Sequence, residues 1–313
     1  MKTARERILL LLADLVPWPI RNLFYRIPGV APLLRGLLNR CLPAANRLTP
    51  VLISAGPLKG CRLAIDYRRE KFFWLGTHEP SVQKALKRLA RPGMTVYDVG
   101  TYIGFFTLLL SQAVGESGRV IALEPNPETH RRLLDNLRLN HRKNVQALML
   151  AAADKSGREL FQTAKNDLAP EAHLVASATV PEPDPAPKVE VETIALDELV
   201  FGRGFPRPDL LKIDVEESET RVLAGMSRIL EECRPAVVCE THGEKASRKV
   251  ARVLRRHHYS LRDLERGEPI PDGTDPRPGR LYLLATPENP MAGQAFLPDR
   301  KAGSGQAGIP DLR

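Results

Sequence analysis

Two glycines in a short acidic loop mark the segment of this chain that is best suited to holding a small molecule. The run DVGTYIG contains Asp98, Gly100 and Gly104, and it lies between a β-branched, strand-like stretch and an apolar helical one. Glycine lets the backbone approach a ligand closely, and the first turn of the following helix presents free amide groups. Because ligands of open parallel sheets bind at the carboxyl ends of the strands, this loop predicts a cofactor site.

Two classes of cofactor compete for such a loop. A dinucleotide requires Gly-x-Gly-x-x-Gly, so that its pyrophosphate can lie on the helix amides. Here Tyr102 and Phe105 take the places of the second and third glycines, and Asp98 adds a charge that would repel a diphosphate. S-adenosylmethionine carries positive charge on its sulfonium and amino groups, so a nearby carboxylate favours it. The loop therefore indicates S-adenosylmethionine, with a nicotinamide-dependent oxidoreductase as the weaker alternative.

Further acids follow the next two strand-like stretches. Glu124 lies about 20 residues after the glycine loop, where an acid binds ribose hydroxyls in nucleotide-binding folds. A favourable charge at the start of a helix is its simpler explanation. Asp154, in the run ADKSG, is placed to contact the adenine, with a plain turn as the alternative.

Ionisable residues also follow two later strand-like stretches. Asp214, in the run LKIDVE, is expected beside the reacting methyl group, with Glu216 close to it. His242, in the run ETH, is a second candidate base for an acceptor hydroxyl, and an exposed loop histidine is the alternative. A metal-assisted variant would use Asp214, Glu240 and His242. Their spacing does not define a ligand set, so no metal is assigned.

The pattern of the chain between these residues is a regular alternation of strands and helices. The expected strands are Thr95–Val99, Arg119–Leu123, Val145–Ala152, Asp209–Ile213, Ala236–Cys239, Tyr259–Leu261 and Leu281–Ala285. The expected helices are Phe105–Val114, Pro127–Asn140, Glu217–Leu230 and Lys245–His257. Such alternation is typical of an α/β protein with parallel βαβ units. We therefore expect a Rossmann-like fold, with a mostly parallel seven-stranded sheet and helices on both of its faces.

Composition divides the chain into three regions. Residues 1–50 are Leu-rich and carry a net charge of +6 out of +9, which predicts a basic helical extension. This extension is either a cap on the core or an interfacial helix that contacts the inner face of a membrane. Residues 51–286 form the expected catalytic domain, interrupted by the proline-rich run PEPDPAP, and residues 287–313 are expected to be a disordered tail.

Charge and cysteine content exclude other classes of protein. The core lacks the basic stripes with interleaved aromatic residues that nucleic-acid binding requires, so no nucleic-acid partner is expected. The four cysteines are scattered without a CxxC pair, which fits a reducing compartment such as the cytoplasm.

Taken together, the motifs resemble the FkbM family of class I S-adenosylmethionine-dependent methyltransferases. The matching runs are YDVGTYIGFFT (97–107), GRVIALEPNP (118–127), NLRLN (136–140), ADKSG (153–157), LD (196–197), KIDVE (212–216) and ETH (240–242), with LGTHE (75–79) as a lead-in. The resemblance implies O-methylation of a hydroxyl on a sugar, glycolipid or secondary metabolite. It implies cofactor-binding roles for Asp98, Gly100, Tyr102, Gly104, Glu124, Asp154 and Glu79, and catalytic roles for Asp214, Glu216 and His242.

The chain departs from the family pattern at two places. The family has Ala-Asn in the glycine loop, where this chain has Thr101 and Tyr102, and Gly where this chain has Glu217. A tyrosine cannot reproduce the compact turn of an asparagine, and a side chain at 217 is expected to crowd the pocket. These departures motivate the alternative of a catalytically inactive, methyltransferase-like binding module.

Overall fold

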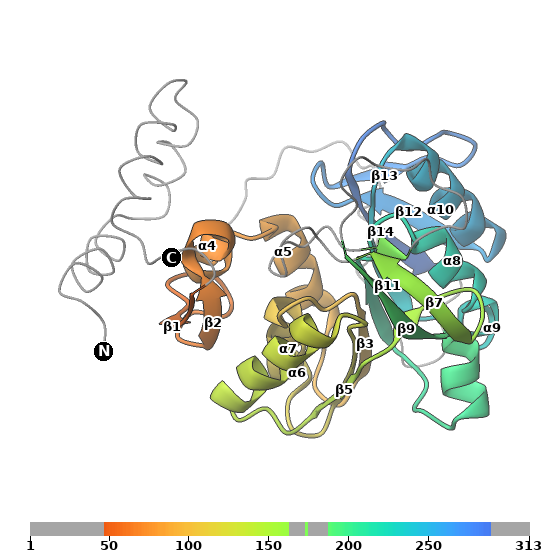
Figure 1. Ribbon diagram of the computed structural model, residues 1–313. Coiled ribbons are helices and arrows are strands. Elements are labelled where there is room, and N and C mark those ends of the chain that lie inside the picture. Colours follow the sequence, from red (N-terminus) through yellow and green to blue (C-terminus); the bar gives the residue numbers. More distant parts are fainter. Residues whose placement is uncertain (1–46, 163–172, 175–186, 289–313) are drawn as a thin grey trace, which may run out of the picture.

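The computed structural model describes residues 47–162, 173–174 and 187–288 (Figure 1). The expected N-terminal helices, residues 289–313 of the expected tail and most of the proline-rich run lie outside the described residues. The predicted start of the tail at residue 287 is wrong, because Pro287 still belongs to the last strand. Among the helices that the structure describes, none combines the length and the apolar character needed to cross a membrane.

An eight-stranded central sheet organises the protein. Its order is β13-β12-β14-β11-β10-β3-β4-β5. The strands are β3 (Thr95–Val99), β4 (Arg119–Leu123), β5 (Val145–Leu148), β10 (Leu210–Ile213), β11 (Ala236–Thr241), β12 (Tyr259–Asp263), β13 (Glu268–Ile270) and β14 (Leu281–Pro287). Neighbours from β5 to β11 pair in parallel, whereas β14 is antiparallel to both β11 and β12. This confirms the expected class I methyltransferase topology, to which β13 adds a short eighth strand at one edge.

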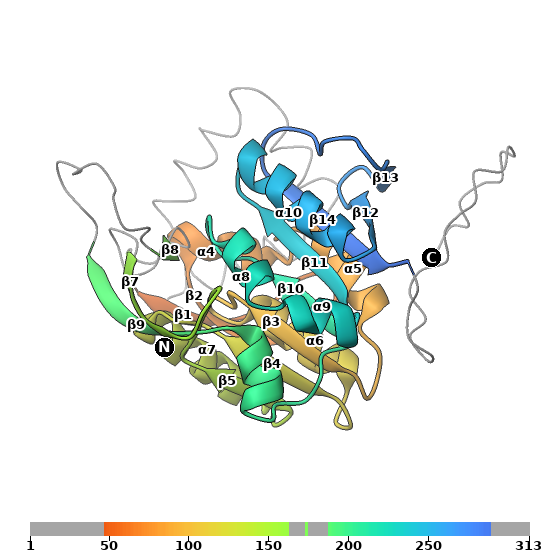
Figure 2. The same ribbon diagram turned by 90° about the vertical axis from the view of Figure 1, so that its right-hand side faces the viewer.

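Helices cover both faces of the sheet. Successive side chains of a strand point to opposite sides, and here the side chains on both sides are apolar, so each face needs a layer of helices. Val96, Val120 and Val238 belong to one apolar cluster, which includes residues of α5 (Pro80–Leu89), α6 (Phe105–Val114) and α7 (Pro127–Leu139). Their neighbours Tyr97 and Ile121 belong to a second cluster with α8 (Glu219–Ala224), α9 (Ser227–Glu232) and α10 (Glu244–Arg256). Figure 2 shows α8, α9 and α10 together over one face of the sheet.

One expected helix and one expected strand are each divided in the structure. The prediction of a single helix Glu217–Leu230 is wrong, because α8 ends at Ala224 and α9 begins at Ser227. Gly225 lies between them, where an added Cβ would be 2.0 Å from the Ala153 carbonyl oxygen. The Asp197 carboxylate then accepts hydrogen bonds from two amides at the start of α9, at 2.9 Å each.

The expected strand Val145–Ala152 is also two strands, and they belong to different sheets. β5 ends at Leu148, and β6 (Ala151–Ala152) pairs with β9 (Lys188–Ile194) in a second, four-stranded sheet. β7 (Gly157–Gln162) and β8 (His173–Leu174) complete that sheet, in the order β6-β9-β7-β8. A short π-helical turn (Glu198–Gly202) follows β9.

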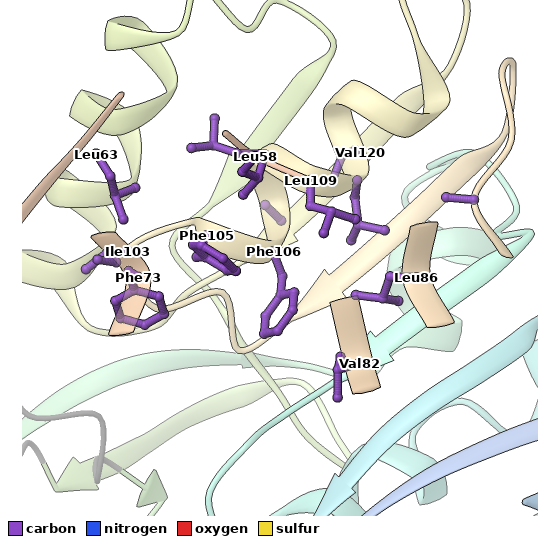
Figure 3. Packing of buried hydrophobic residues seen from close by; sticks show 14 of the residues in the cluster. Leu58, Leu63, Phe73, Val82, Leu86, Ile103, Phe105, Phe106, Leu109 and Val120 are labelled. Atoms are coloured by element: carbon purple, nitrogen blue, oxygen red, sulfur yellow. The ribbon is translucent and has the colours of Figure 1, made fainter. Parts of the chain in front are cut away.

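A hairpin and a helix precede the central sheet. The hairpin strands are β1 (Leu48–Leu52), which begins before the expected domain start at residue 51, and β2 (Arg62–Asp66), and α4 (Tyr67–Leu75) follows them. Leu58 and Leu63 of this region pack in the same apolar cluster as Ile103 and Phe105 (Figure 3). The hairpin therefore packs against the loop that precedes α6.

Asn136 on α7 joins the hairpin to the glycine loop. Its side-chain oxygen accepts a hydrogen bond from the Ala64 amide, and its side-chain nitrogen donates to the Ile103 carbonyl, at 2.8 Å each. The residue is completely buried. The run NLRLN therefore serves to dock one part of the chain on another.

We predict that Asn136→Ala lowers the free energy of unfolding by about 1–3 kcal/mol, because it leaves two buried backbone groups without partners. A urea melt followed by circular dichroism measures the change. Asp135→Ala is the matched control, since this neighbour makes only exposed ion pairs of small expected value. Equal midpoints for the two variants would show that the bridge contributes nothing.

Candidate functional site

A cavity of about 500 Å³ lies at the carboxyl ends of β3, β4 and β10. Its wall includes Val99 and Leu123 at the strand ends, Phe73 from α4 and Phe161 from β7. The predicted site residues that line it are Glu79, Gly100, Tyr102, Glu124, Asp214 and Glu216. Its size is typical of pockets that bind cofactors or other small ligands.

Both glycines of the loop occupy positions that disfavour a larger residue. Gly100 has a φ of 78°, and an added Cβ would lie 1.8 Å from the Asp214 carbonyl oxygen. Gly104 has a φ of 89° and precedes α6, where an added Cβ would lie 2.5 Å from a methyl carbon of Leu133. The glycines therefore allow the loop to pack directly on the segment after β10 and on α7.

Glu124 presents a buried carboxylate to the cavity. Its two oxygens accept hydrogen bonds from the backbone amides of Tyr102, at 2.9 Å, and Asn126, at 3.0 Å. Burial raises the pKa of this carboxyl group to about 8, although the two amide hydrogen bonds oppose the shift. The structure thus places Glu124 where ribose hydroxyls could donate to it, and that role remains a prediction.

Tyr102 forms part of the cavity wall and leaves the cavity open. Its hydroxyl donates to Glu70 of α4 at 2.5 Å, and its ring centroid lies 6.0 Å from that of Phe73. Glu70 also accepts hydrogen bonds from the Asp66 amide at 2.8 Å and from Arg132 at 2.6 Å. The tyrosine therefore links the glycine loop to α4, instead of forming the compact turn of an asparagine.

The two departures from the family pattern share one backbone feature. Tyr102 has a φ of 51° and Glu217 a φ of 61°, which is the left-handed region that favours glycine and asparagine. Glu217 is exposed and is not among the residues that line the cavity. The expectation that its side chain crowds the pocket is therefore wrong.

Asp98 lies behind the glycine loop. The residue is completely buried and is not among the cavity-lining residues. Its carboxylate accepts a hydrogen bond from the Thr107 hydroxyl at 2.6 Å and lies 3.5 Å from the Lys212 ammonium group. Its predicted contact with the cofactor stays a prediction, since in this structure its partners are protein groups.

Lys212 is a central residue of the site to which the sequence analysis assigned no role. Its ammonium group donates to the Gly100 carbonyl and to the Asp214 carboxylate, at 3.2 Å each. Burial alone would lower its pKa, but the charges of Asp214, Asp98 and Glu79 raise it well above the ordinary value. A lysine within the otherwise apolar, buried strand LLKI is the signal that could have identified it.

His242 lies among three carboxylates next to the cavity. Its Nδ1 hydrogen-bonds to Glu219 at 2.6 Å, and its Nε2 is 3.1 Å from Glu216 and 3.2 Å from Glu240. Burial by itself would lower the pKa of His242, but the hydrogen bond to Glu219 and the surrounding acids raise it. His242 does not itself line the cavity, whereas its neighbour Glu216 does.

Asp154 forms an ion pair with a residue of α8. Its carboxylate pairs with Arg221 of α8 at 2.6 Å, and Arg221 also pairs with Glu159 of β7. Asp154 is not among the residues that line the cavity. The predicted contact between Asp154 and the adenine is therefore untested.

Two further side chains, Arg280 and His78, complete the site. His78 lies in the lead-in run LGTHE, whereas no local pattern in the sequence marks Arg280. Arg280, just before β14, contacts Glu240 and lies 3.4 Å from Glu79. Burial and the nearby Asp214 raise the pKa of Glu79 to about 7. His78 packs against Phe73, Phe105 and Phe106, and burial lowers its pKa to about 4. His78 is therefore uncharged at neutral pH.

Residues 98–261 match the model of the methyltransferase FkbM domain, which is just over half of the chain. The chain belongs to this family. Family membership confirms that it is a methyltransferase of the class that uses S-adenosylmethionine as methyl donor.

Two curated proteins and one solved structure are similar to this chain. The 31-O-demethyl-FK506 methyltransferase FkbM of Streptomyces tacrolimicus is 29% identical over 209 residues, which is 59% of this chain and 79% of the relative. The hexuronic acid methyltransferase AglP of Haloferax volcanii is 28% identical over 176 residues, which is 56% of this chain and 67% of the relative. A solved FkbM methyltransferase from Methylobacillus flagellatus is 17% identical, with a TM-score of 0.39 and coverage of 71% of this chain and 56% of that one.

We predict that S-adenosylmethionine binds to this FkbM-family methyltransferase more tightly as the pH rises towards 8. If ribose hydroxyls donate to Glu124, the bound carboxyl group is ionised, so binding below its free-state pKa of about 8 must release a proton. Affinity should therefore fall about tenfold for each pH unit below 8 and level off above it.

Isothermal titration at several pH values measures this slope. Glu124→Gln cannot ionise, so the slope should disappear in this variant, and a slope that persists in Glu124→Gln would assign the titration to another group.

We predict that Glu217→Gly stabilises the protein by about 1 kcal/mol, because glycine removes the strain of a left-handed backbone at this exposed position. For a protein of this size, that corresponds to a rise in Tm of about 2–4 °C. Glu217→Ala is the control, because it keeps the Cβ and should therefore leave the stability unchanged. A calorimetric scan in which both variants melt together would contradict the strain argument.

Proposed function

We propose that this chain transfers the methyl group of S-adenosylmethionine to a hydroxyl oxygen of a small-molecule or glycan acceptor. The observation that carries the proposal is the cavity at the carboxyl edge of the sheet, where Gly100, Glu124 and Asp214 come from three different strand ends to line one space. The printed names of the relatives support the acceptor class. One is named as a methyltransferase of 31-O-demethyl-FK506, and the other as a methyltransferase of hexuronic acid.

The reaction that fits this site is a direct displacement. The acceptor oxygen forms a bond to the methyl carbon while the bond between that carbon and the sulfonium sulfur breaks. The products are a methyl ether and S-adenosylhomocysteine, and the hydroxyl proton passes to a carboxylate at the cavity. Holding the two reactants in line can supply on the order of 7–11 kcal/mol of the acceleration.

Asp214 is the candidate for that carboxylate. It lines the cavity, and its backbone carbonyl contacts Gly100 in the cofactor loop. Burial alone would raise its pKa, but the charge of Lys212 at 3.2 Å lowers it below the ordinary value. Asp214 is therefore ionised at neutral pH and can accept a proton as the new bond forms.

The residues that motivated an inactive module do not obstruct the site. Tyr102 is held against Glu70, and Glu217 is exposed. These positions support the enzymatic proposal over a module that only binds.

We further propose that the enzyme is cytoplasmic. Liposome flotation with and without residues 1–50 would show whether this segment contacts a membrane.

We predict that Asp214→Asn lowers kcat by about 10²–10⁴-fold, the range expected for loss of a general base. The dissociation constant for S-adenosylmethionine should change little, since the substitution keeps the shape of the side chain. Release of S-adenosylhomocysteine with a panel of sugar and polyol acceptors measures turnover, and calorimetry measures binding. Unchanged turnover would remove Asp214 from the mechanism, and failure of the parent protein to bind S-adenosylmethionine would overturn the proposal.

A further inference from the structure

Three potential metal ligands converge beside the cofactor cavity. One ligand atom from each of Asp214, Glu240 and His242 lies within 4.8 Å of the other two. The reason is the register of two parallel strands, in which Ile213 of β10 is level with Cys239 of β11. The residues that follow these two positions therefore reach the same point at the carboxyl edge of the sheet.

The orientation of His242 is set by a buried carboxylate. Glu219, whose side chain is 1% exposed, hydrogen-bonds to Nδ1 at 2.6 Å. Because a carboxylate accepts, Nδ1 carries the proton, and Nε2 is the nitrogen that faces Glu216 and Glu240. A carboxylate that orients a histidine through its second nitrogen is the usual support of a metal-binding histidine.

Glu240 contributes a buried carboxylate oxygen that has no hydrogen-bond partner among the described residues. Its side chain is 2% exposed, and this oxygen is Oε2. Nε2 of His242 also makes no hydrogen bond to a described residue, although oxygens of Glu216 and Glu240 lie 3.1 and 3.2 Å from it. Arg280 contacts the other oxygen, Oε1. A buried acceptor without a partner costs free energy, so a ligand at Oε2 would stabilise this arrangement.

The charge balance of this cluster also favours a cation. Among the described residues, the cluster around His242 contains five carboxyl groups and two permanent cations, Lys212 and Arg280. These acids are Glu79, Asp214, Glu216, Glu219 and Glu240. Lys212 is shared with a sixth acid, Asp98. Buried carboxylates require compensation, and a divalent ion would offset the excess negative charge.

We propose that Asp214, Glu240 and His242 bind one divalent metal ion, held by two carboxylate oxygens and Nε2 of the histidine. A mixed oxygen and imidazole set suits Mn²⁺ and neighbouring divalent ions better than Ca²⁺, which binds through oxygen alone. Three protein ligands leave coordination positions open, as in metal sites that also bind a substrate. Asp214 lines the cavity, so those positions are accessible from it.

The open positions give the ion a function in recognising the acceptor, a step that rests on the proposed methyl transfer. Two adjacent oxygens of a sugar or hydroxy acid could bind the ion together, which would orient one hydroxyl towards the methyl donor. The acceptor class is then a compound with neighbouring oxygen atoms.

Titration of the metal-free full chain with Mn²⁺, followed by electron paramagnetic resonance, tests the site without donor or acceptor. We expect saturable loss of the free-ion signal, with one ion bound per chain. His242→Gln and Glu240→Gln should each weaken affinity at least tenfold, and Glu219→Gln about tenfold through loss of orientation. If Glu240→Gln does not fold by circular dichroism, Asp214→Asn and His242→Gln decide the question.

Glu217→Gln is the matched control, because it removes an acid from the same segment at an exposed position and should leave Mn²⁺ affinity unchanged. Absence of saturable binding, or equal affinity in His242→Gln and the parent protein, would overturn the metal site. Methyl transfer with and without a chelator separates the two proposals. Mn²⁺ binding without any transfer refutes only the proposed function, and transfer that a chelator leaves unchanged, without Mn²⁺ binding, refutes only the metal site.

Discussion

The carbonyl oxygen of Asp214 lies against the α-carbon of Gly100, so close that an added Cβ would be 1.8 Å from it. This contact joins the loop after β3 to the segment after β10, and Lys212 reinforces it by donating to the Gly100 carbonyl and the Asp214 carboxylate. Residues of both loops line the cavity. Any side chain at position 100 would separate them, and the cofactor loop would then move away from the residue proposed to act in the reaction.

Buried charge at the carboxyl edge of the sheet follows from this arrangement. Parallel strands end at the same edge, so Asp98, Lys212 and Glu240 lie near one another although they are far apart in sequence. Burial raises the pKa of the carboxyl groups of Glu79 and Glu124 to about 7 and about 8. A positively charged ligand beside these groups would favour their ionised form, so this edge is suited to the sulfonium donor and to a divalent ion.

The segment before the central sheet completes the cavity, and it explains how the chain tolerates its unusual glycine loop. Glu70 of α4 accepts the Tyr102 hydroxyl, and it is held in turn by Arg132 of α7 and by the Asp66 amide. The larger side chain at position 102 therefore replaces a local turn with a contact between distant segments. The side chain of Glu217 is exposed, so it needs no partner within the protein. Its backbone is strained, because a residue with a side chain adopts a positive φ there.

The sequence by itself determined the features that depend on local patterns. β3, β4 and α6 have the expected bounds, because a continuous run of apolar residues bounded by turn residues is a property of neighbouring residues. The glycine loop, the acid after β4 and the family followed from short motifs. Only the tertiary structure decided the division of Glu217–Leu230 at Gly225, the second sheet and the partners of Lys212, Glu70 and Arg280. Those features depend on contacts between residues that are distant in sequence, and no local pattern records which buried charges will meet.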